Sequence, residues 1–277
     1  MQTNISQIIT LVSWGNSYLQ KGTDLSKAEF FPGNPAFAAC REVSFVDLDL
    51  VGDDYEEQDY AADPLAWLAK LKSEKYNKLQ LRYESAAQQG LSDRETVSQP
   101  GAGGRWLIEA INPICSDFWE SSWDEGEANE TAPKGWTVAY GRIAKFMPTQ
   151  EFEAPSLDGL NFTLQAALTE IAEFAKDHKH NAFGTMFDSG IDALKADKPF
   201  FGDKNGLIVA EHFSLPALRI LKCIESAWVF ANANSWNHVK FESRKDSALH
   251  ARLSDELFSI YIQGILCAVN NGFAAAK

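Results

Sequence analysis

The residues best suited to chemistry are the carboxylates of one short segment, residues 47–59, which contains no lysine or arginine. Such a run suits two tasks. It can hold Ca²⁺ or Mg²⁺, which require several converging oxygen ligands, or it can attract a basic protein. A solvated surface is the third interpretation. The acidic members are Asp47, Asp49, Asp53, Asp54, Glu56, Glu57 and Asp59.

A metal site is the least favoured of these interpretations. The acidic segment does not fit the twelve-residue calcium loop, because the required glycine and the closing glutamate are misplaced. The five histidines form no HExxH motif, and no cysteine–histidine spacing is typical of zinc. We therefore expect no metal and no cofactor, and we assign the seven carboxylates to a partner-binding surface.

Catalytic motifs are also missing from the sequence. The glycine-rich stretch Pro100–Arg105 precedes a predicted strand, whereas a phosphate-binding loop follows a strand and opens a helix. No G-x-S-x-G motif marks a nucleophile. A Ser–His–acid triad that only the fold assembles is not excluded, so an enzyme remains an alternative.

Two groups of aromatic and amide residues complete the predicted contact set. Trp119 and Trp123 share one strand face and can anchor a partner, although burial in the core is the favoured interpretation. Asn234, Trp236 and Asn237 lie at the exit of an apolar helix, where a capping or corner role competes with partner binding.

The charge favours a basic partner. The chain has 25 basic and 38 acidic residues, which gives a net charge of −13. Residues 1–150 carry 13 basic and 22 acidic residues, net −9, so most of the acidity lies in the first half. Nucleic acid and anionic membranes bind through lysine and arginine, so neither is an expected partner. Four dispersed cysteines, no leader and no bilayer-spanning apolar run indicate a reduced, cytoplasmic protein.

The first half of the chain, residues 1–150, predicts an α+β domain with a mostly antiparallel sheet and flanking helices. Helical spacing covers residues 4–20, and Asp63–Pro64 opens a second helix that runs to about residue 72. Period-two alternation in residues 42–51 places Val46, Leu48 and Leu50 opposite Asp47 and Asp49. The other predicted strands are residues 79–84, 105–111, 117–123 and 136–146.

The second half, residues 151–277, predicts a domain that resembles a four-helix bundle, after a linker at residues 148–158. Apolar stripes indicate helices around residues 164–175 and 183–194, and a fourth from residue 246 to Gly272. The third and central helix is predicted within Ser214–Trp236, where apolar residues cover most of the circumference.

Three short segments resemble uncharacterised bacterial protein families. SAWVF (Ser226–Phe230) followed by SWN (Ser235–Asn237) is similar to a segment of small bacterial helical proteins, in which the spacer is usually glycine-rich. Here the spacer, residues 231–234, is Ala-Asn-Ala-Asn. GGRWLIE and VAYGRI also resemble pieces of such proteins. The resemblance implies a bacterial, cytoplasmic origin and no activity.

These observations predict a non-catalytic, acidic binding protein, of the kind that acts as an immunity-type inhibitor of a basic toxin or nuclease. One alternative is a small-molecule enzyme with its site between the sheet and the bundle. Another is a structural or oligomeric protein, and the sequence does not predict the oligomeric state.

Overall fold

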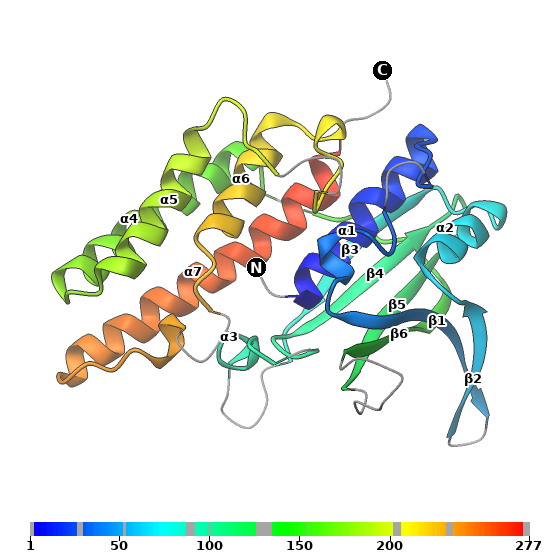
Figure 1. Cartoon of the computed structure of the whole chain (residues 1–277), viewed down its shortest axis with the longest axis horizontal. Coiled ribbons are helices and arrows are strands. Elements are labelled where there is room, and N and C mark those ends of the chain that lie inside the picture. The colour runs from blue at the N-terminus through cyan, green and yellow to red at the C-terminus, as the bar shows by residue number, and fades with distance from the viewer. Residues whose placement is uncertain are drawn as a thin grey trace.

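A computed structural model describes residues 3–26, 30–51, 54–86, 92–99, 101–125, 135–153, 155–201, 206–230 and 235–273. Within these ranges the chain is an α+β protein, with a six-stranded sheet at the right of Figure 1 and packed helices at the left. The predicted fold class is confirmed.

The sheet has the strand order β2-β1-β6-β5-β4-β3 and is mostly antiparallel. Only β1 and β6 pair in parallel, which the long connection through the rest of the sheet permits. The strands are β1 (Cys40–Val51), β2 (Asp54–Ala61), β3 (Lys78–Glu84), β4 (Arg105–Ile111), β5 (Ser116–Glu125) and β6 (Trp136–Met147).

Two helices cover one face of this sheet. Helix α1 (Thr3–Asn16) continues as a π-helical turn, Ser17–Lys21, and ends at Gly22 in the left-handed conformation. Helix α2 (Pro64–Ser73) begins at Asp63, whose side chain accepts a 2.8 Å hydrogen bond from the Ala66 N–H. Both predicted helices are therefore confirmed, and so are their start and stop signals.

Aromatic side chains fill the space between α2 and the sheet. Phe45 on β1 stacks on Trp67 with ring centroids 4.4 Å apart and on Tyr140 at 5.1 Å. Trp119 meets Phe45 and Trp67 edge-on. All four rings are buried, and each buries a large apolar area, so this cluster is the core of the sheet half.

The acidic segment contains a strand that the sequence pattern does not predict. Residues 54–61 form β2, which pairs with β1 at one edge of the sheet. The predicted alternation in β1 is present, but Asp47 and Asp49 lie on the helix-covered side, with Phe45. Val46 and Leu48 therefore point to the opposite side of the sheet. The side chain of Leu50 lies outside the description.

The other edge strand, β3, is closed by two asparagines from distant helices. Asn16 of α1 accepts a hydrogen bond from the Leu79 N–H at 2.8 Å and donates to the Leu79 carbonyl at 2.9 Å. Asn270 makes the same pair of bonds with Leu81, at 2.7 and 2.9 Å. Each amide imitates a neighbouring strand, so this edge is not open to further pairing.

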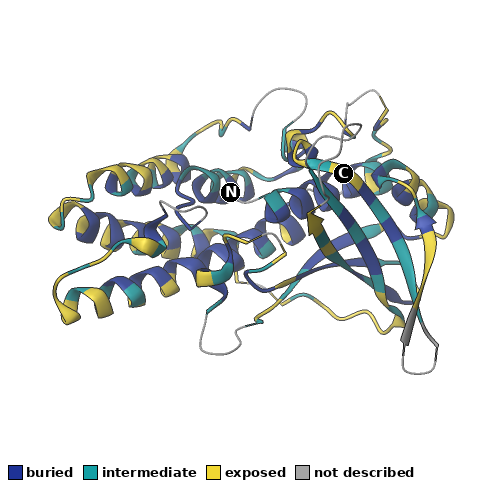
Figure 2. Cartoon of the chain, turned by 60° about the horizontal axis from the view of Figure 1, so that its bottom comes forward, coloured by how far each residue is buried: buried dark blue, intermediate teal, exposed yellow. Residues whose placement is uncertain are grey.

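The second half packs four helices against one another with their buried sides turned inward (Figure 2). The predicted fourth helix is confirmed, with Gly272 as its C-cap. The predicted central helix is shorter than its apolar stretch, because it ends at Ser226 while Trp228 and Phe230 continue the core without helical structure. The helices are α4 (Leu157–Asp177), α5 (Asn181–Lys195), α6 (Leu215–Ser226) and α7 (Arg244–Asn271).

The two halves share one hydrophobic core. The boundary predicted at residues 150/151 falls in a non-helical segment between β6 and α4. Helix α1 nevertheless bonds to the second half, since Trp14 donates to the Gly206 carbonyl at 3.2 Å and Ser13 accepts from the Val209 N–H at 3.0 Å. None of the helices in the described ranges has the length and apolar character that crossing a membrane requires.

Candidate functional site

The acidic segment divides into an internally paired part and an exposed part. Asp47 accepts hydrogen bonds from Arg142, and Lys145 lies 2.9 Å from Asp47 and 2.6 Å from Asp49. Burial opposes ionisation of Asp47, but the bonds from Arg142 and Lys145 outweigh it and hold the pKa of that carboxyl below its usual value. These two carboxylates are therefore structural partners of β6.

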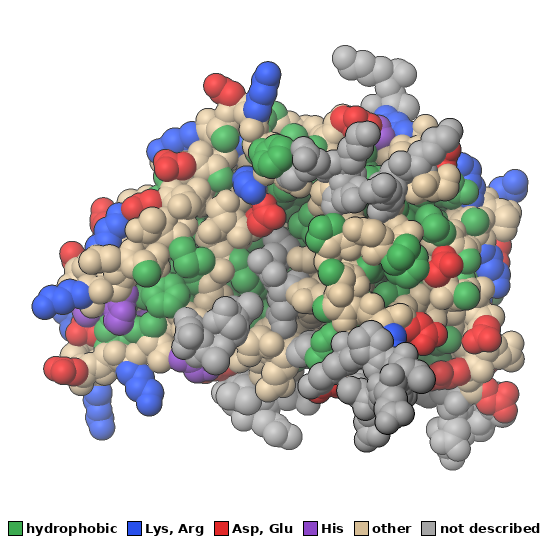
Figure 3. Space-filling view, in the orientation of Figure 1, with side chains coloured by type: hydrophobic (Ala, Val, Ile, Leu, Met, Phe, Trp, Pro, Cys, Tyr) green, Lys and Arg blue, Asp and Glu red, His purple; other side chains and the backbone are tan. Residues whose placement is uncertain are grey.

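The exposed part lies on the edge strand β2. Glu56, Glu57 and Asp59 are exposed, and within the described ranges no ion pair joins them to the rest of the chain. Acidic side chains gather at the lower right of Figure 3, over the region of β2. Asp53 lies outside the described residues, and only the backbone of Asp54 is described, as the first residue of β2.

The predicted tryptophan patch is not a surface patch. Trp119 is fully buried in the core of the sheet half, so its ring cannot contact a partner without local unfolding. Trp123 is partly exposed, donates to Ser121 at 3.1 Å and lies edge-on to Trp136. Of this pair, only Trp123 stays a candidate contact.

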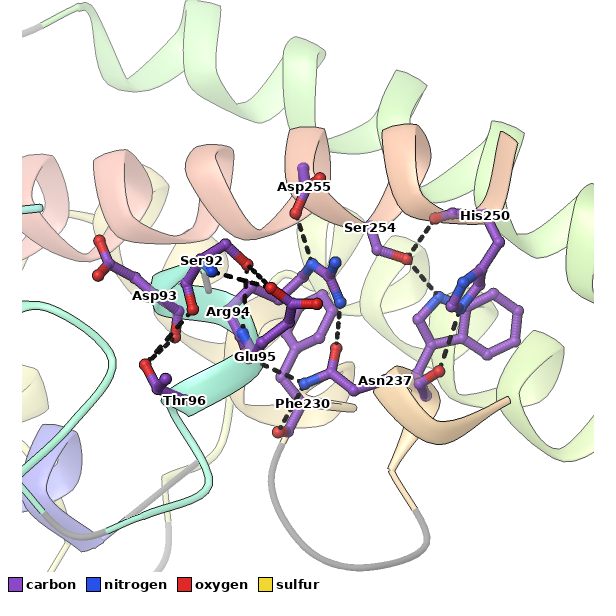
Figure 4. Close-up of polar contacts among 11 residues, drawn as sticks. Ser92, Asp93, Arg94, Glu95, Thr96, Phe230, Asn237, His250, Ser254 and Asp255 are labelled. Carbon is purple, nitrogen blue, oxygen red and sulfur yellow. Dashed lines mark hydrogen bonds and ion pairs between the residues drawn. The ribbon is translucent and has the colours of Figure 1, made fainter. Parts of the chain in front are cut away.

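A second polar site joins the sheet half to the helical half (Figure 4). Arg94 lies in the short helix α3 (Asp93–Thr96), and its side chain is almost fully buried. It donates to Asp255 of α7 at 2.6 Å and to Asn237 at 2.6 Å, and Asn237 returns a 2.8 Å bond to the Arg94 carbonyl. One guanidinium thus connects α3 to two segments that each lie more than 100 residues further along the chain.

The residues predicted at the exit of the central helix belong to this junction. Asn237 is the amide that pairs with Arg94, so its role within the chain is a corner contact. Trp236 is fully buried and cannot serve as a surface contact. Asn234 lies outside the described residues. The capping or corner interpretation agrees with these positions better than partner binding does.

A hydrogen-bonded chain fixes Trp236 next to the junction. Its indole N–H donates to Ser254 at 2.8 Å, Ser254 donates to the His250 carbonyl at 2.6 Å, and His250 Nε2 donates to the Trp236 carbonyl at 3.1 Å. Burial lowers the pKa of His250 to about 4. The ring is therefore neutral at pH 7, with its proton on Nε2.

A cavity of about 430 Å³ opens beside Arg94, between β3 and α7. Phe258, Ile262 and Leu266 form its apolar wall, and Tyr83 closes one side, with its hydroxyl donating to Asp93 at 2.6 Å. Burial and then the bond to Asp93 raise the pKa of Tyr83 above its ordinary value, so the hydroxyl keeps its proton. The rest of the rim is polar: Ser85, Ser92, Asp255, Ser259 and Gln263.

The fold does assemble one serine–histidine pair. Ser17 Oγ lies 2.9 Å from His212 Nδ1, and Glu211 lies 3.7 Å from the other ring nitrogen. Ser17 is fully buried and also shares a 2.5 Å bond with Thr23, so no substrate reaches its oxygen in this conformation. The pair lies at the π-helical turn after α1, with the Ser17 hydroxyl buried.

Neither a metal centre nor a known relative guides the assignment. Among the residues that the structure describes, no three His, Cys, Asp or Glu side chains are arranged to hold a metal ion. Comparison with protein-family models, with curated proteins and with solved structures finds no match.

Sequence reasoning missed Arg94 and Asp255, which join the sheet half to α7. One local signal was present, because Ser92 and Glu95 have the spacing of a capping box, and both of its hydrogen bonds form. Hydrogen bonds from the backbone and the side chain of Ser92 lower the pKa of Glu95. That signal predicts the helix that carries Arg94, although it does not indicate which residues Arg94 contacts.

Proposed function

We propose that the protein is a non-catalytic binding protein that captures a basic protein through the acidic edge strand β2, in the manner of an immunity-type inhibitor of a basic toxin or nuclease. The observation that carries the proposal is the exposure of Glu56, Glu57 and Asp59, whose charges are not neutralised by any described neighbour. Asp47 and Asp49 are already paired within the chain, so the proposed binding surface does not include them.

The physical basis is electrostatic complementarity. Unpaired charges of one sign accelerate the approach of an oppositely charged partner and orient it, and salt screens this attraction over about 8–10 Å. An edge strand also presents backbone groups that lack a neighbouring strand, and a partner strand can bind to these. Charged residues on an edge strand can also serve only to prevent aggregation. A direct test must therefore show that these charges contribute to the binding of a partner.

The first prediction concerns these three charges. The triple variant Glu56→Gln, Glu57→Gln, Asp59→Asn is expected to bind a ten-residue lysine peptide about 5–10-fold more weakly than the wild type at low salt. The difference should shrink at 0.5 M salt, because the attraction is screened. Isothermal titration calorimetry at the two salt concentrations measures both effects.

A matched control removes the same charge elsewhere. Glu151, Glu173 and Asp192 are exposed and make no described ion pair, so their neutralisation changes the net charge equally without touching β2. Equal losses in the two triple variants would mean that only the overall charge acts, and the assignment to β2 would be wrong.

A second candidate function rests on the cavity between β3 and α7. An apolar wall with a polar rim, at a boundary between structural units, is typical of a small-molecule site. The cavity supports a ligand-binding or enzymatic role at this junction.

A substitution that fills the cavity tests this second candidate function. Ser259 is exposed on the cavity rim, so Ser259→Trp blocks the space without disturbing the core. A bound metabolite at 100 times its dissociation constant adds about 2.7 kcal/mol of stability, which corresponds to roughly 5 °C in melting temperature. Thermal-shift screening of a metabolite library should find such a compound for the wild type and lose it in the variant. A screen without hits would speak against this candidate.

A further inference from the structure

One end of the sheet exposes three large apolar side chains. Ile114, in the turn between β4 and β5, is 90% exposed, and Phe146 and Met147, at the end of β6, are 74% and 44% exposed. Ser116 pairs with Met147, so the turn lies beside the end of β6. We call Ile114, Phe146 and Met147 the apolar tip. Grouped exposed apolar side chains of this size mark interaction sites more often than isolated ones.

The backbone of Phe146 shows that its exposure is built into the fold. Its φ is +55°, a left-handed conformation that costs a bulky residue free energy. The register of β5 and β6 shifts between Ser116 and Phe118, so Phe146 lies in a β-bulge. Bulges of this kind redirect a side chain, and they are frequent next to binding sites.

A buried carboxylate holds the bulge from inside. Asp117 is fully buried, and its Oδ1 accepts the Phe146 N–H at 2.8 Å. Its Oδ2 accepts the Tyr76 hydroxyl at 2.5 Å and an Arg142 N–H at 3.1 Å. Arg142 is in turn bonded to Asp47 of β1. The position of Phe146 is therefore linked through two side chains to the strand that pairs with β2.

The apolar tip and the acidic strand lie at the same end of the sheet. Lys145, next to Phe146, contacts Asp49 at 2.6 Å, and Asp49 is the register partner of Glu56. Glu56 thus lies two strands from the apolar tip, within the span of a single protein interface, which is about 800 Å² per partner. Lys145 is already paired with Asp47 and Asp49, so the surface combines the exposed apolar side chains with the negative charge of Glu56.

The geometry points to the apolar tip as the anchor of the binding surface, with Phe146 inserted into an apolar pocket on a partner whose pocket is flanked by lysine or arginine. This inference rests on the proposed function, since the carboxylates of β2 supply the charge complementarity that identifies the partner as basic. In many protein interfaces, exposed charges steer association and a few aromatic anchors provide most of the affinity.

The test uses two synthetic peptides of equal length and charge, one alternating lysine with leucine and the other alternating lysine with serine. The full-length wild type is expected to bind the lysine–leucine peptide about ten-fold more tightly, because only that peptide offers apolar contact to the tip. Phe146→Gly should abolish most of this preference. Glycine accepts a positive φ, so this variant should fold with an unchanged or higher melting temperature.

Two controls separate this inference from the proposed function. Phe162→Ser removes an equally exposed ring from α4 and should leave the peptide preference unchanged. Neutralising Glu56, Glu57 and Asp59 should weaken both peptides alike. If neutralisation weakens neither peptide, the proposed function fails; if it weakens both but Phe146→Gly keeps the preference, only the anchor fails. If the wild type sediments as a dimer and the Phe146→Gly variant as a monomer, the apolar tip binds a second copy of the chain. That result would overturn the inference of a basic partner.

Discussion

Replacing Trp236 with alanine is expected to lower the free energy of unfolding by about 3–5 kcal/mol, the range for truncating a large buried aromatic residue. The indole is fully buried where α4, α5 and α7 meet, and its loss leaves a cavity that the surrounding rings fill only in part. Urea denaturation followed by circular dichroism measures the change. The rings within reach of Trp236 are Phe174, His180, Phe183, Phe187, Phe241 and His250.

Trp228 offers a matched control for the hydrogen bond of Trp236. Both side chains are buried, but the Trp228 indole N–H has no hydrogen-bond partner among the described residues, whereas that of Trp236 donates to Ser254. Trp236→Phe should therefore cost about 1 kcal/mol more than Trp228→Phe, the net value of one hydrogen bond. Equal costs would show that packing alone holds Trp236, and that the chain to Ser254 and His250 adds nothing.

The elements that the sequence predicts well are those whose own residues carry the signal. Helix α2 has a cap at Asp63 and proline in its first turn, and α7 repeats apolar residues along most of its length and ends at Gly272. Strand β3 alternates apolar and polar residues and β4 is mostly apolar, and both are present within two residues of the predicted bounds. Periodicity and capping are local, so one sequence is enough to detect them.

The elements that the sequence misses depend on distant partners. β2 consists largely of acidic and polar residues, which disfavour strands, and it forms because β1 offers its edge. The apolar stretch after α6 resembles more helix, but Tyr261 donates to the Ala227 carbonyl at 3.0 Å and the Val229 carbonyl accepts from the Trp236 N–H at 2.9 Å. These bonds to other segments satisfy backbone groups that a longer helix would have paired.

In the candidate sites too, the features with a local sequence signal can be predicted and those that depend on distant residues cannot. The excess of acidic residues is readable in the sequence, and three of the seven carboxylates lie exposed on β2. The pairing of Asp47 with Arg142, 95 residues away, is not readable, and neither is the contact of Arg94 with Asp255 across 161 residues. A left-handed phenylalanine is equally invisible, because residue type favours an ordinary strand at that position.

The titration of His250 is expected to lower the stability of the protein by about 3 kcal/mol as the pH drops from 7 to 4, because this residue titrates near pH 6.5 when unfolded and near pH 4 when folded. Between these values the unfolded chain binds the extra proton, so acid favours unfolding; above pH 7 the residue contributes no pH dependence. His250→Gln keeps a side-chain N–H for the Trp236 carbonyl and removes the titration. Urea denaturation at pH 4.5, 5.5 and 7 should therefore give a stability that depends less on pH for the variant than for the wild type.

Carboxyl groups such as Asp47 also destabilise the protein in acid, when they take up protons below about pH 5. They do so in both proteins, so their effect cancels in the comparison. If the stability of the two proteins changes with pH in the same way, the proton taken up on unfolding does not bind to His250.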